Sequence, residues 1–263
     1  MRTPVLVLLL LAAVSIHAEV IVPQTGAARV WVPVAGHAQG ANGTFFRSEI
    51  SVTNLRSTAQ RVRVFWLPQG ASGSSTPLQT YDVPAGRGFS SDDFVDRLLF
   101  QSGLGAIEIV GVTAANAPDP AAVLHVTSRI WTPRPDGGEG TMSQTFPAVI
   151  AGASAASNIK DIYGMRRGAQ YRLNVGVLNP SDTTQRFHVI VTIEGPSGIS
   201  AETFDLDVPP RAIQQTTVPG TGTGVALVRV EDLDGGAGDW QTWASSVDNQ
   251  SGDAWSQMGF AKP

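Results

Sequence analysis

The chain contains an internal repeat, and this feature constrains its fold more than any other. The segment from Phe46 to Trp66 aligns without a gap with the segment from Tyr171 to Val191, at an offset of 125 residues. Seven of the 21 aligned positions hold the same residue type, where unrelated segments would share about one or two. In the first segment these positions are Arg47, Val52, Asn54, Thr58, Gln60, Arg61 and Val64. The repeat predicts that one structural unit occurs twice.

Further matches in the same order extend the repeat over most of the chain. The same offset places Val83-Pro84 on a second Val-Pro pair, and residues 106–109 then match 227–230 after loops of different length. The sequence therefore predicts two homologous domains, 28–147 and 148–263, each of about 115 residues and large enough to enclose its own core.

Apolar and polar residues alternate along both copies, for example from Phe187 to Ile193 and from Val62 to Trp66. A period of two predicts strands with one buried face. We expect strands at 29–37, 46–54, 62–66, 78–84, 105–112, 122–131 and 140–148, and in the second copy at 158–165, 170–178, 187–193, 201–208, 224–231, 240–249 and 253–260. Such short strands, separated by turn residues, predict an all-β protein of two tandem homologous immunoglobulin-like β-sandwich domains.

One short helix is expected outside this pattern, at residues 91–101. A serine and an acidic first turn precede apolar residues at helical spacing there. The second copy has no such segment, so we expect this helix to be a connection between strands without a catalytic role.

The buried face of the strands at 122–131 and 240–249 stays open. Leu124 looks buried, yet its aligned counterpart Thr242 is less apolar than Trp243 on the opposite face.

The first 18 residues have the layout of a secretory signal peptide. Arg2 carries a positive charge, an apolar stretch runs from Val5 to Val14, and small residues end at Ala18. The stretch has about ten residues, half the roughly 20 of a membrane-spanning helix, so we expect residues 1–18 to be removed and no membrane span to remain. The chain has no cysteine, as is usual for exported bacterial proteins. We expect a periplasmic or extracellular bacterial protein.

Five blocks of the sequence carry a resemblance to a known module. They are VPVAGH at 32–37, GANGTFFRSEI at 40–50, VTSRIW at 126–131, VLNPS at 177–181 and ASSVDNQSGD at 244–253. They resemble a tandem immunoglobulin-like β-sandwich module of exported bacterial proteins, which occurs alone or appended to larger secreted proteins, including proteases. The resemblance covers residues 28–263. It implies the fold and export but no activity, because the family has no assigned function.

Composition and motifs favour a protein that is not an enzyme. The 18 Lys+Arg and 22 Asp+Glu give a formal charge of −4 without a basic run, so nucleic acid is not an expected partner. His37, His125 and His188 lack the spacing of a zinc motif, and a zinc site would need ligands gathered from separate strands. We expect these histidines on strand surfaces or in loops. No G-x-S-x-G motif is present, and we predict no catalytic residue and no organic cofactor.

Two pairs of arginines recur at matched positions, Arg47 with Arg172 and Arg61 with Arg186. A repeated ligand contact is one interpretation. We favour the other, in which each arginine pairs with a carboxylate of its own domain, because features that both copies share are most simply scaffold.

An acidic loop is the best candidate metal site. Glu231, Asp232, Asp234 and Asp239 lie within nine residues, and the glycines among them would let the backbone fold around calcium. The acidic positions do not follow the full calcium-loop pattern, so a solvated hairpin loop is the favoured alternative.

Two tryptophans are candidates for ligand contact. Trp240 and Trp243 are separated by an odd number of residues, so in a regular strand they point to opposite faces and at least one is expected at the surface. An exposed aromatic side chain on a sandwich suits contact with a sugar or a protein.

Together these features predict an exported, non-enzymatic binding or structural protein of adhesion type that contacts a protein or a polysaccharide. The alternatives are a secreted hydrolase with a shallow carboxylate site and a self-assembling subunit of a surface layer or fibre.

Overall fold

A computed structural model describes residues 26–134, 137–152, 157–196, 198–235 and 238–261. The predicted signal peptide lies outside the described residues. Nearly all of the described secondary structure is β-strand, which confirms the predicted all-β class. No helix in these ranges is long and apolar enough to cross a bilayer.

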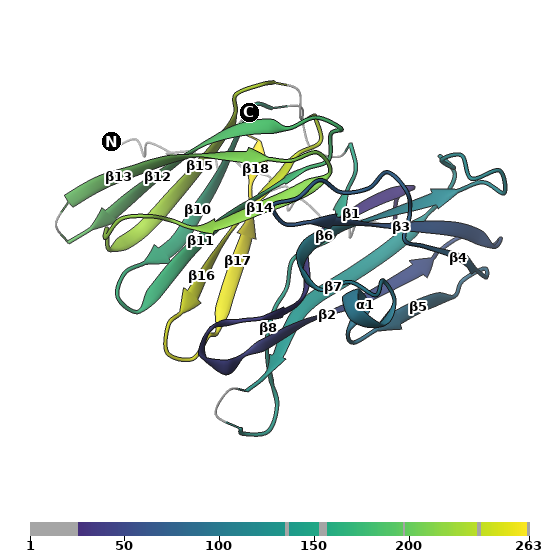
Figure 1. The fold of residues 1–263 in the computed structure, drawn as a ribbon, viewed down its shortest axis with the longest axis horizontal. Helices are drawn as coiled ribbons and strands as arrows, with labels where there is room; N and C mark the ends of the chain where they lie inside the picture. The colour runs from purple at the N-terminus through teal and green to yellow at the C-terminus, as the bar shows by residue number, and fades with distance from the viewer. Residues whose placement is uncertain (1–25, 135–136, 153–156, 197, 236–237, 262–263) are drawn as a thin grey trace, which may run out of the picture.

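The first half of the chain folds into two facing layers of strands (Figure 1). One layer has the order β4-β3-β6-β1-β9, and the other has the order β5-β2-β7-β8. The bounds are β1 (Arg29–Gln39), β2 (Phe45–Asn54), β3 (Gln60–Pro68), β4 (Gln79–Val83), β5 (Gly88–Ser91), β6 (Gly103–Val112), β7 (Leu124–Pro133), β8 (Thr141–Gln144) and β9 (Val149–Ile150). A single turn of helix, α1 (Phe94–Arg97), connects β5 to β6, and a 3-10 turn, η1 (Ala41–Gly43), connects β1 to β2.

The second half forms two corresponding sheets, β13-β12-β15-β10-β18 and β14-β11-β16-β17. The bounds are β10 (Ile159–Arg167), β11 (Tyr171–Asn179), β12 (Gln185–Gly195), β13 (Gly198–Val208), β14 (Ala212–Thr217), β15 (Gly224–Asp232), β16 (Gln241–Asp248), β17 (Ala254–Met258) and β18 (Phe260–Ala261).

Both halves use the same strand order, and an irregularity recurs in both. The pairing of β1 with β6 shifts register between Val32 and Ala35, and that of β10 with β15 shifts between Ile162 and Met165. The short β9 pairs with β1 as β18 pairs with β10, so the first sandwich reaches Ile150 rather than ending at residue 147. The shared order agrees with the sequence repeat.

The immunoglobulin-like assignment stays a prediction within this sandwich architecture. In an immunoglobulin constant domain the first strand lies beside the second in the ABED sheet. Here β1 pairs with β6 over most of its length and with β2 only through its last residues, His37 to Gln39.

Each sandwich encloses its own apolar core. Val62 and Val64 on β3 point inward in the first sandwich, as Phe187 and Val189 on β12 do in the second, and all four are completely buried. Burying a side chain of this kind stabilises the fold by about 1.5–3 kcal/mol relative to leaving it exposed. The alternation that predicted strands therefore also identified the inward face.

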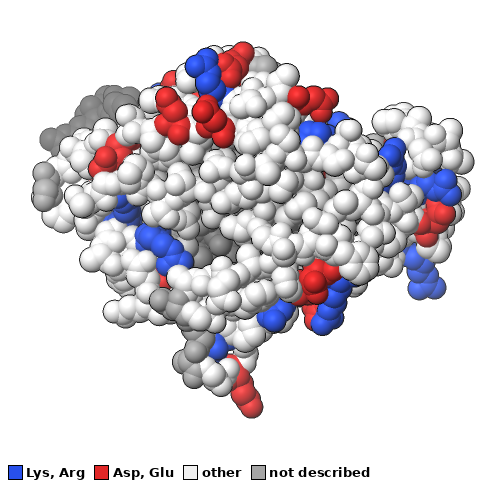
Figure 2. Space-filling model, in the orientation of Figure 1, with Lys and Arg blue, Asp and Glu red and all other residues white. Residues whose placement is uncertain are grey.

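A third apolar cluster joins the two sandwiches. It lies between the outer face of β3, β6 and β1 and the outer face of β14, β11 and β16. Its largest members are Trp31 and Trp243, which are 2% and 0% exposed. The other buried members are Val34, Phe65, Leu67, Ala106, Val110, Val112, Ile130, Phe146, Leu178 and Ile213. The two sandwiches therefore pack together through a shared apolar contact. On the face drawn in Figure 2, the charged side chains lie mainly toward the edges.

Strand pairing corrects one part of the sequence alignment. Val126 faces Val52 on β2, and Thr242 faces the equivalent Val177 on β11. The offset here is 242 − 126 = 116 residues, so the counterpart of Leu124 is Trp240 rather than Thr242. Both lie in the cores of their own sandwiches, which settles the inward face of both strands. The alignment slipped because the loops before these strands differ in length.

Three strands, β5, β9 and β14, were not anticipated, and the expected helix is shorter than predicted. β5 and β14 are edge strands held by backbone pairing with β2 and β11 rather than by a row of apolar side chains. In the segment predicted as helix 91–101, regular helix covers only Phe94–Arg97, and Phe100 takes a left-handed backbone conformation that cannot continue it.

Candidate functional site

The acidic loop that follows β15 uses its first carboxylates within the loop itself. Asp232 accepts hydrogen bonds from the backbone N–H groups of Asp234 and Gly235, both at 3.1 Å. Asp234 pairs with Arg186 at 2.9 Å, and hydrogen bonding to this guanidinium lowers the pKa of the Asp234 carboxyl. Asp234 therefore belongs to a surface ion pair.

The remaining members of this loop do not converge on a common point. Asp239 reaches the first sandwich, where its Oδ2 accepts hydrogen bonds from Trp31 Nε1 at 3.2 Å and from the Gly152 backbone N–H at 2.8 Å. Among the described residues, the group of three metal-ligating side chains whose ligand atoms lie within 4.8 Å of one another is a different one. The predicted calcium ligands Glu231, Asp232, Asp234 and Asp239 do not form such a group.

The expectation of an exposed tryptophan at 240 or 243 is wrong. Trp240 is 1% exposed and Trp243 is 0% exposed. Trp240 directly precedes β16 and lies in the core of the second sandwich, so the two side chains do point to opposite faces, as the alternation predicted. Trp243 is on the outer face of β16, but the first sandwich covers that face. Neither side chain is available for ligand contact.

Most polar features that the two halves share are structural. Asn54 Nδ2 donates to the carbonyl oxygens of Thr58, Val83 and Pro84, and the matched Asn179 makes the same three contacts. Arg61 pairs with Asp82 on the neighbouring strand β4, and Arg186 pairs with Asp234 in the loop after β15, so each of these arginines has a carboxylate partner in its own sandwich. These contacts agree with the interpretation that shared residues are scaffold, so functional residues are better sought where the halves differ.

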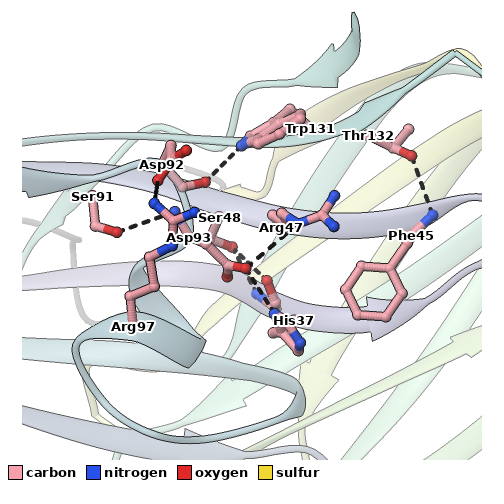
Figure 3. A network of polar contacts seen from close by, with 11 residues as sticks. His37, Phe45, Arg47, Ser48, Ser91, Asp92, Asp93, Arg97, Trp131 and Thr132 are labelled. Atoms are coloured by element: carbon pink, nitrogen blue, oxygen red, sulfur yellow. Dashed lines mark hydrogen bonds and ion pairs between the residues drawn. The ribbon is translucent and has the colours of Figure 1, made fainter.

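The clearest difference is a buried polar network at the end of β1 in the first sandwich (Figure 3). His37 on β1 and Arg47 on β2 are paired in register, so their side chains lie on the same face. Asp93, which follows β5, is 4% exposed and accepts a hydrogen bond from His37 Nδ1 at 2.9 Å through its Oδ2. The Arg47 Nε lies 3.5 Å from the same oxygen. Two cationic or donor groups therefore share one oxygen of a buried carboxylate.

Aromatic rings hold the arginine of this network in place. The Arg47 guanidinium carbon lies 4.9 Å from the ring centroid of Phe45 and 5.3 Å from that of Trp131. Trp131 Nε1 donates to the backbone carbonyl of Asp92 at 2.7 Å, which ties β7 to the segment before α1. The His37 ring meets Phe45 edge to face at 4.7 Å.

The second sandwich has different chemistry at the equivalent place. Strand pairing makes Arg167 the counterpart of His37 and Val218 the counterpart of Asp93. Arg167 Nη2 donates to the Val218 carbonyl oxygen at 3.2 Å. Both halves have a contact between these two positions, but at this place only the first half has an imidazole–carboxylate pair.

Phe100 adds an exposed aromatic residue to the same segment. Its side chain is 75% exposed, and its backbone φ is +55°. Bulky residues avoid this conformation, which glycine normally supplies at the end of a helix. Backbone strain of this kind is often retained at functional sites.

A groove of about 180 Å³ lies between the two sandwiches, lined by apolar residues such as Phe46 and Phe146 and by Arg172. The Arg172 Nη1 donates to Asn249 Oδ1 at 3.2 Å, and no carboxylate among the described residues forms an ion pair with it, so the expectation that each recurring arginine pairs with a carboxylate is wrong for Arg172. Burial lowers the pKa of the Arg172 guanidinium. This groove suits a small apolar group that carries a carboxylate or carbonyl oxygen.

One buried lysine lies apart from both places. Lys160 on β10 is 1% exposed, its Nζ donates to the Trp240 carbonyl oxygen, and it lies 4.6 Å from the centroid of the Trp240 ring. Burial lowers the pKa of Lys160 to about 8, while the charge of Asp239 acts in the opposite direction.

Sequence reasoning missed the His37–Asp93 network because its members come from three separate segments. Spacing along the chain shows no motif, and the helix was set aside because the second copy lacks it. The lack of this helix in the second copy could have identified the segment, because it shows that the segment is not part of the scaffold that both halves share.

In comparisons with known proteins, no model of a protein family matches the chain, and no curated protein sequence is similar enough to count as a relative.

Proposed function

We propose that the protein is an exported, non-enzymatic binding or adhesion-type protein that contacts a protein or a polysaccharide through residues 92–101 and the adjoining surface of the first sandwich. The signal-like pattern of residues 1–18 and the absence of cysteine support export to the periplasm or the medium of a bacterium.

The observation that carries the proposal is Phe100. Its ring is 75% exposed on a backbone with φ +55°, although a glycine would fit this place with less strain. Exposed aromatic rings are typical contact residues for sugars and for protein partners. The described residues of the second half contain no helix equivalent to the one beside Phe100, so the shared fold does not require this segment.

The test compares Phe100→Ser with a matched control. Ile199 on β13 is also 75% exposed, so Ile199→Ser removes a similarly exposed apolar side chain from the other sandwich. The chain from Glu19 to Pro263 is immobilised and exposed to purified bacterial polysaccharides and to fractionated envelope and secreted proteins, and binding is measured by surface plasmon resonance.

We expect a saturable partner whose affinity falls at least tenfold in Phe100→Ser, in line with the loss of an aromatic contact residue. Binding should be unchanged in Ile199→Ser. Equal losses in both variants, or no saturable partner at all, would contradict the proposal. Capture of the chain by itself alone would favour a self-assembling subunit.

A further inference from the structure

Three ligand-type side chains converge beside α1 in the first sandwich. His37 ends the long pairing of β1, Asp93 immediately precedes α1, and Asp96 lies within that helix. One ligand atom from each of the three lies within 4.8 Å of the other two. We propose that His37, Asp93 and Asp96 bind one divalent transition-metal ion, for which Zn²⁺ is the best match.

The second observation is an unsatisfied oxygen on the buried member of this group. Asp93 is 4% exposed, and its Oδ1 is buried without a hydrogen-bond donor from any residue that the structure describes. Leaving a buried polar atom unpaired costs about 1–3 kcal/mol, and more where the group is charged. A cation bound at Oδ1 would satisfy this oxygen, while Arg47 remains beside Oδ2.

The place of Asp93 directly before α1 adds to the argument from its unpaired Oδ1. Aspartate is favoured at a helix N-cap because its carboxylate accepts hydrogen bonds from the first backbone N–H groups. Asp93 occupies this N-cap but makes no side-chain capping bond. Its carboxylate turns toward His37 instead, at 2.9 Å. The Asp93 carboxylate therefore does not cap α1 and points toward the other two candidate ligands instead.

The ligand set indicates the class of metal. Imidazole nitrogen combined with carboxylate oxygen suits Zn²⁺ and related transition metals, whereas calcium takes oxygen ligands. Two carboxylates beside one arginine leave a net negative charge when His37 is neutral, which favours a divalent cation. Three protein ligands would leave a fourth position of a tetrahedral zinc site for water or a ligand atom.

The second sandwich supplies a matched control. His188 and Asp205 also pair, at 2.6 Å, but they are at the surface and belong to no group of three potential ligands among the described residues. Glu231 faces His188 from β15, so carboxylates flank a histidine in both halves, but only in the first, among the described residues, do three ligand atoms lie within 4.8 Å of one another.

The experiment is a Zn²⁺ titration of the tag-free chain from Glu19 to Pro263 after dialysis against a chelator. Isothermal calorimetry gives stoichiometry and affinity, and plasma mass spectrometry gives the metal retained after gel filtration. We expect one Zn²⁺ per chain, an affinity at least tenfold weaker in His37→Gln and in Asp96→Asn, and no change in His188→Gln.

Two kinds of result would overturn the assignment. One is no stoichiometric Zn²⁺ binding, or binding that persists in both His37→Gln and Asp96→Asn. The other is Ca²⁺ binding that His37→Gln leaves intact, since that would place the cation on oxygen ligands alone. His37 and Asp96 are partly or fully exposed, so their variants should fold, and circular dichroism spectra confirm this before titration.

Discussion

At the scale of single residues, the two halves differ at a buried position where an ionisable side chain takes the place of an apolar one. Lys160 lies on β10 at the place of Val30 on β1, as the shared register of the two strands shows. Val30 belongs to the apolar core of the first sandwich, whereas Lys160 brings an ammonium group to a buried place beside Trp240. The second half therefore has an ammonium group where the first has the apolar side chain of a valine.

Lys160→Met should stabilise the protein at neutral pH and flatten its pH dependence. The pKa of Lys160 is about 8 in the folded chain against an ordinary value of 10.5. The unfolded chain therefore binds more protons between these values, and stability rises with pH through this window. The shift corresponds to about 3 kcal/mol, from which the lost hydrogen bond subtracts about 1 kcal/mol.

Guanidinium unfolding at pH 7 and pH 9.5 checks this prediction. The free energy of unfolding of the unaltered protein should increase between the two pH values, and that of Lys160→Met should increase less. An unaltered protein whose stability does not rise over this range would show that the ammonium group is adequately solvated.

At the scale of elements, α1 and its flanks are the part of the first sandwich that departs from the common plan. The turn ends in a non-glycine residue with positive φ, and its N-cap makes no side-chain capping bond. Both features make the segment less stable than a helix of the same length with ordinary caps. It is held instead by Phe94 and Val95, which are completely buried in the core.

Phe100→Gly should raise stability even though it removes a large side chain. Glycine adopts φ +55° without strain, and the ring is 75% exposed, so little burial is lost. We expect a gain of about 1 kcal/mol in the free energy of unfolding, measured by chemical denaturation. Ile199→Gly, in a strand, should lose about 0.5–1 kcal/mol. A destabilised Phe100→Gly would mean that the ring packs on the protein.

The elements also show where sequence reasoning reaches its limit. The repeat and the alternation predicted most long strands, because burial of one face imposes its period directly on the sequence. They could not place Trp243, because its burial depends on a contact between sandwiches. They also missed the approach of His37 to Asp93, since the lateral pairing of β1, β2 and β5 brings these residues together, and that pairing leaves no spacing signal in the chain.

At the scale of the whole molecule, a buried ion pair helps hold the sandwiches together. Glu108 on β6 is 1% exposed and lies between Arg29 of its own sandwich at 2.9 Å and Arg211 of the other at 2.5 Å. The Arg211 guanidinium also lies 5.3 Å from the centroid of the Phe65 ring. The contact between sandwiches therefore combines apolar area with a charge pair.

Arg211→Met should destabilise the protein by about 3 kcal/mol, because it leaves a buried carboxylate with one of its two partners. Arg211 has a positive φ, and methionine is as strained in this conformation as arginine. The change in stability therefore comes from loss of the charge and not from the backbone. Arg186→Met, which breaks the exposed pair with Asp234, should cost less than about 1 kcal/mol. Differential scanning calorimetry of the three proteins measures both effects. Equal shifts of the midpoint would show that the ion pair between sandwiches carries no special weight.

The apolar contact between the sandwiches joins different faces of the two copies, which makes it a heterologous interface in the vocabulary of oligomers. Among separate subunits such an interface repeats without end unless rotation closes it into a ring. Here Asp161 paired with Arg229 occupies the place of Trp31 and Glu108, and Thr127 occupies the place of Trp243. A third copy would meet polar surface at either end. The residues that would have to repeat the apolar contact are therefore polar in both sandwiches.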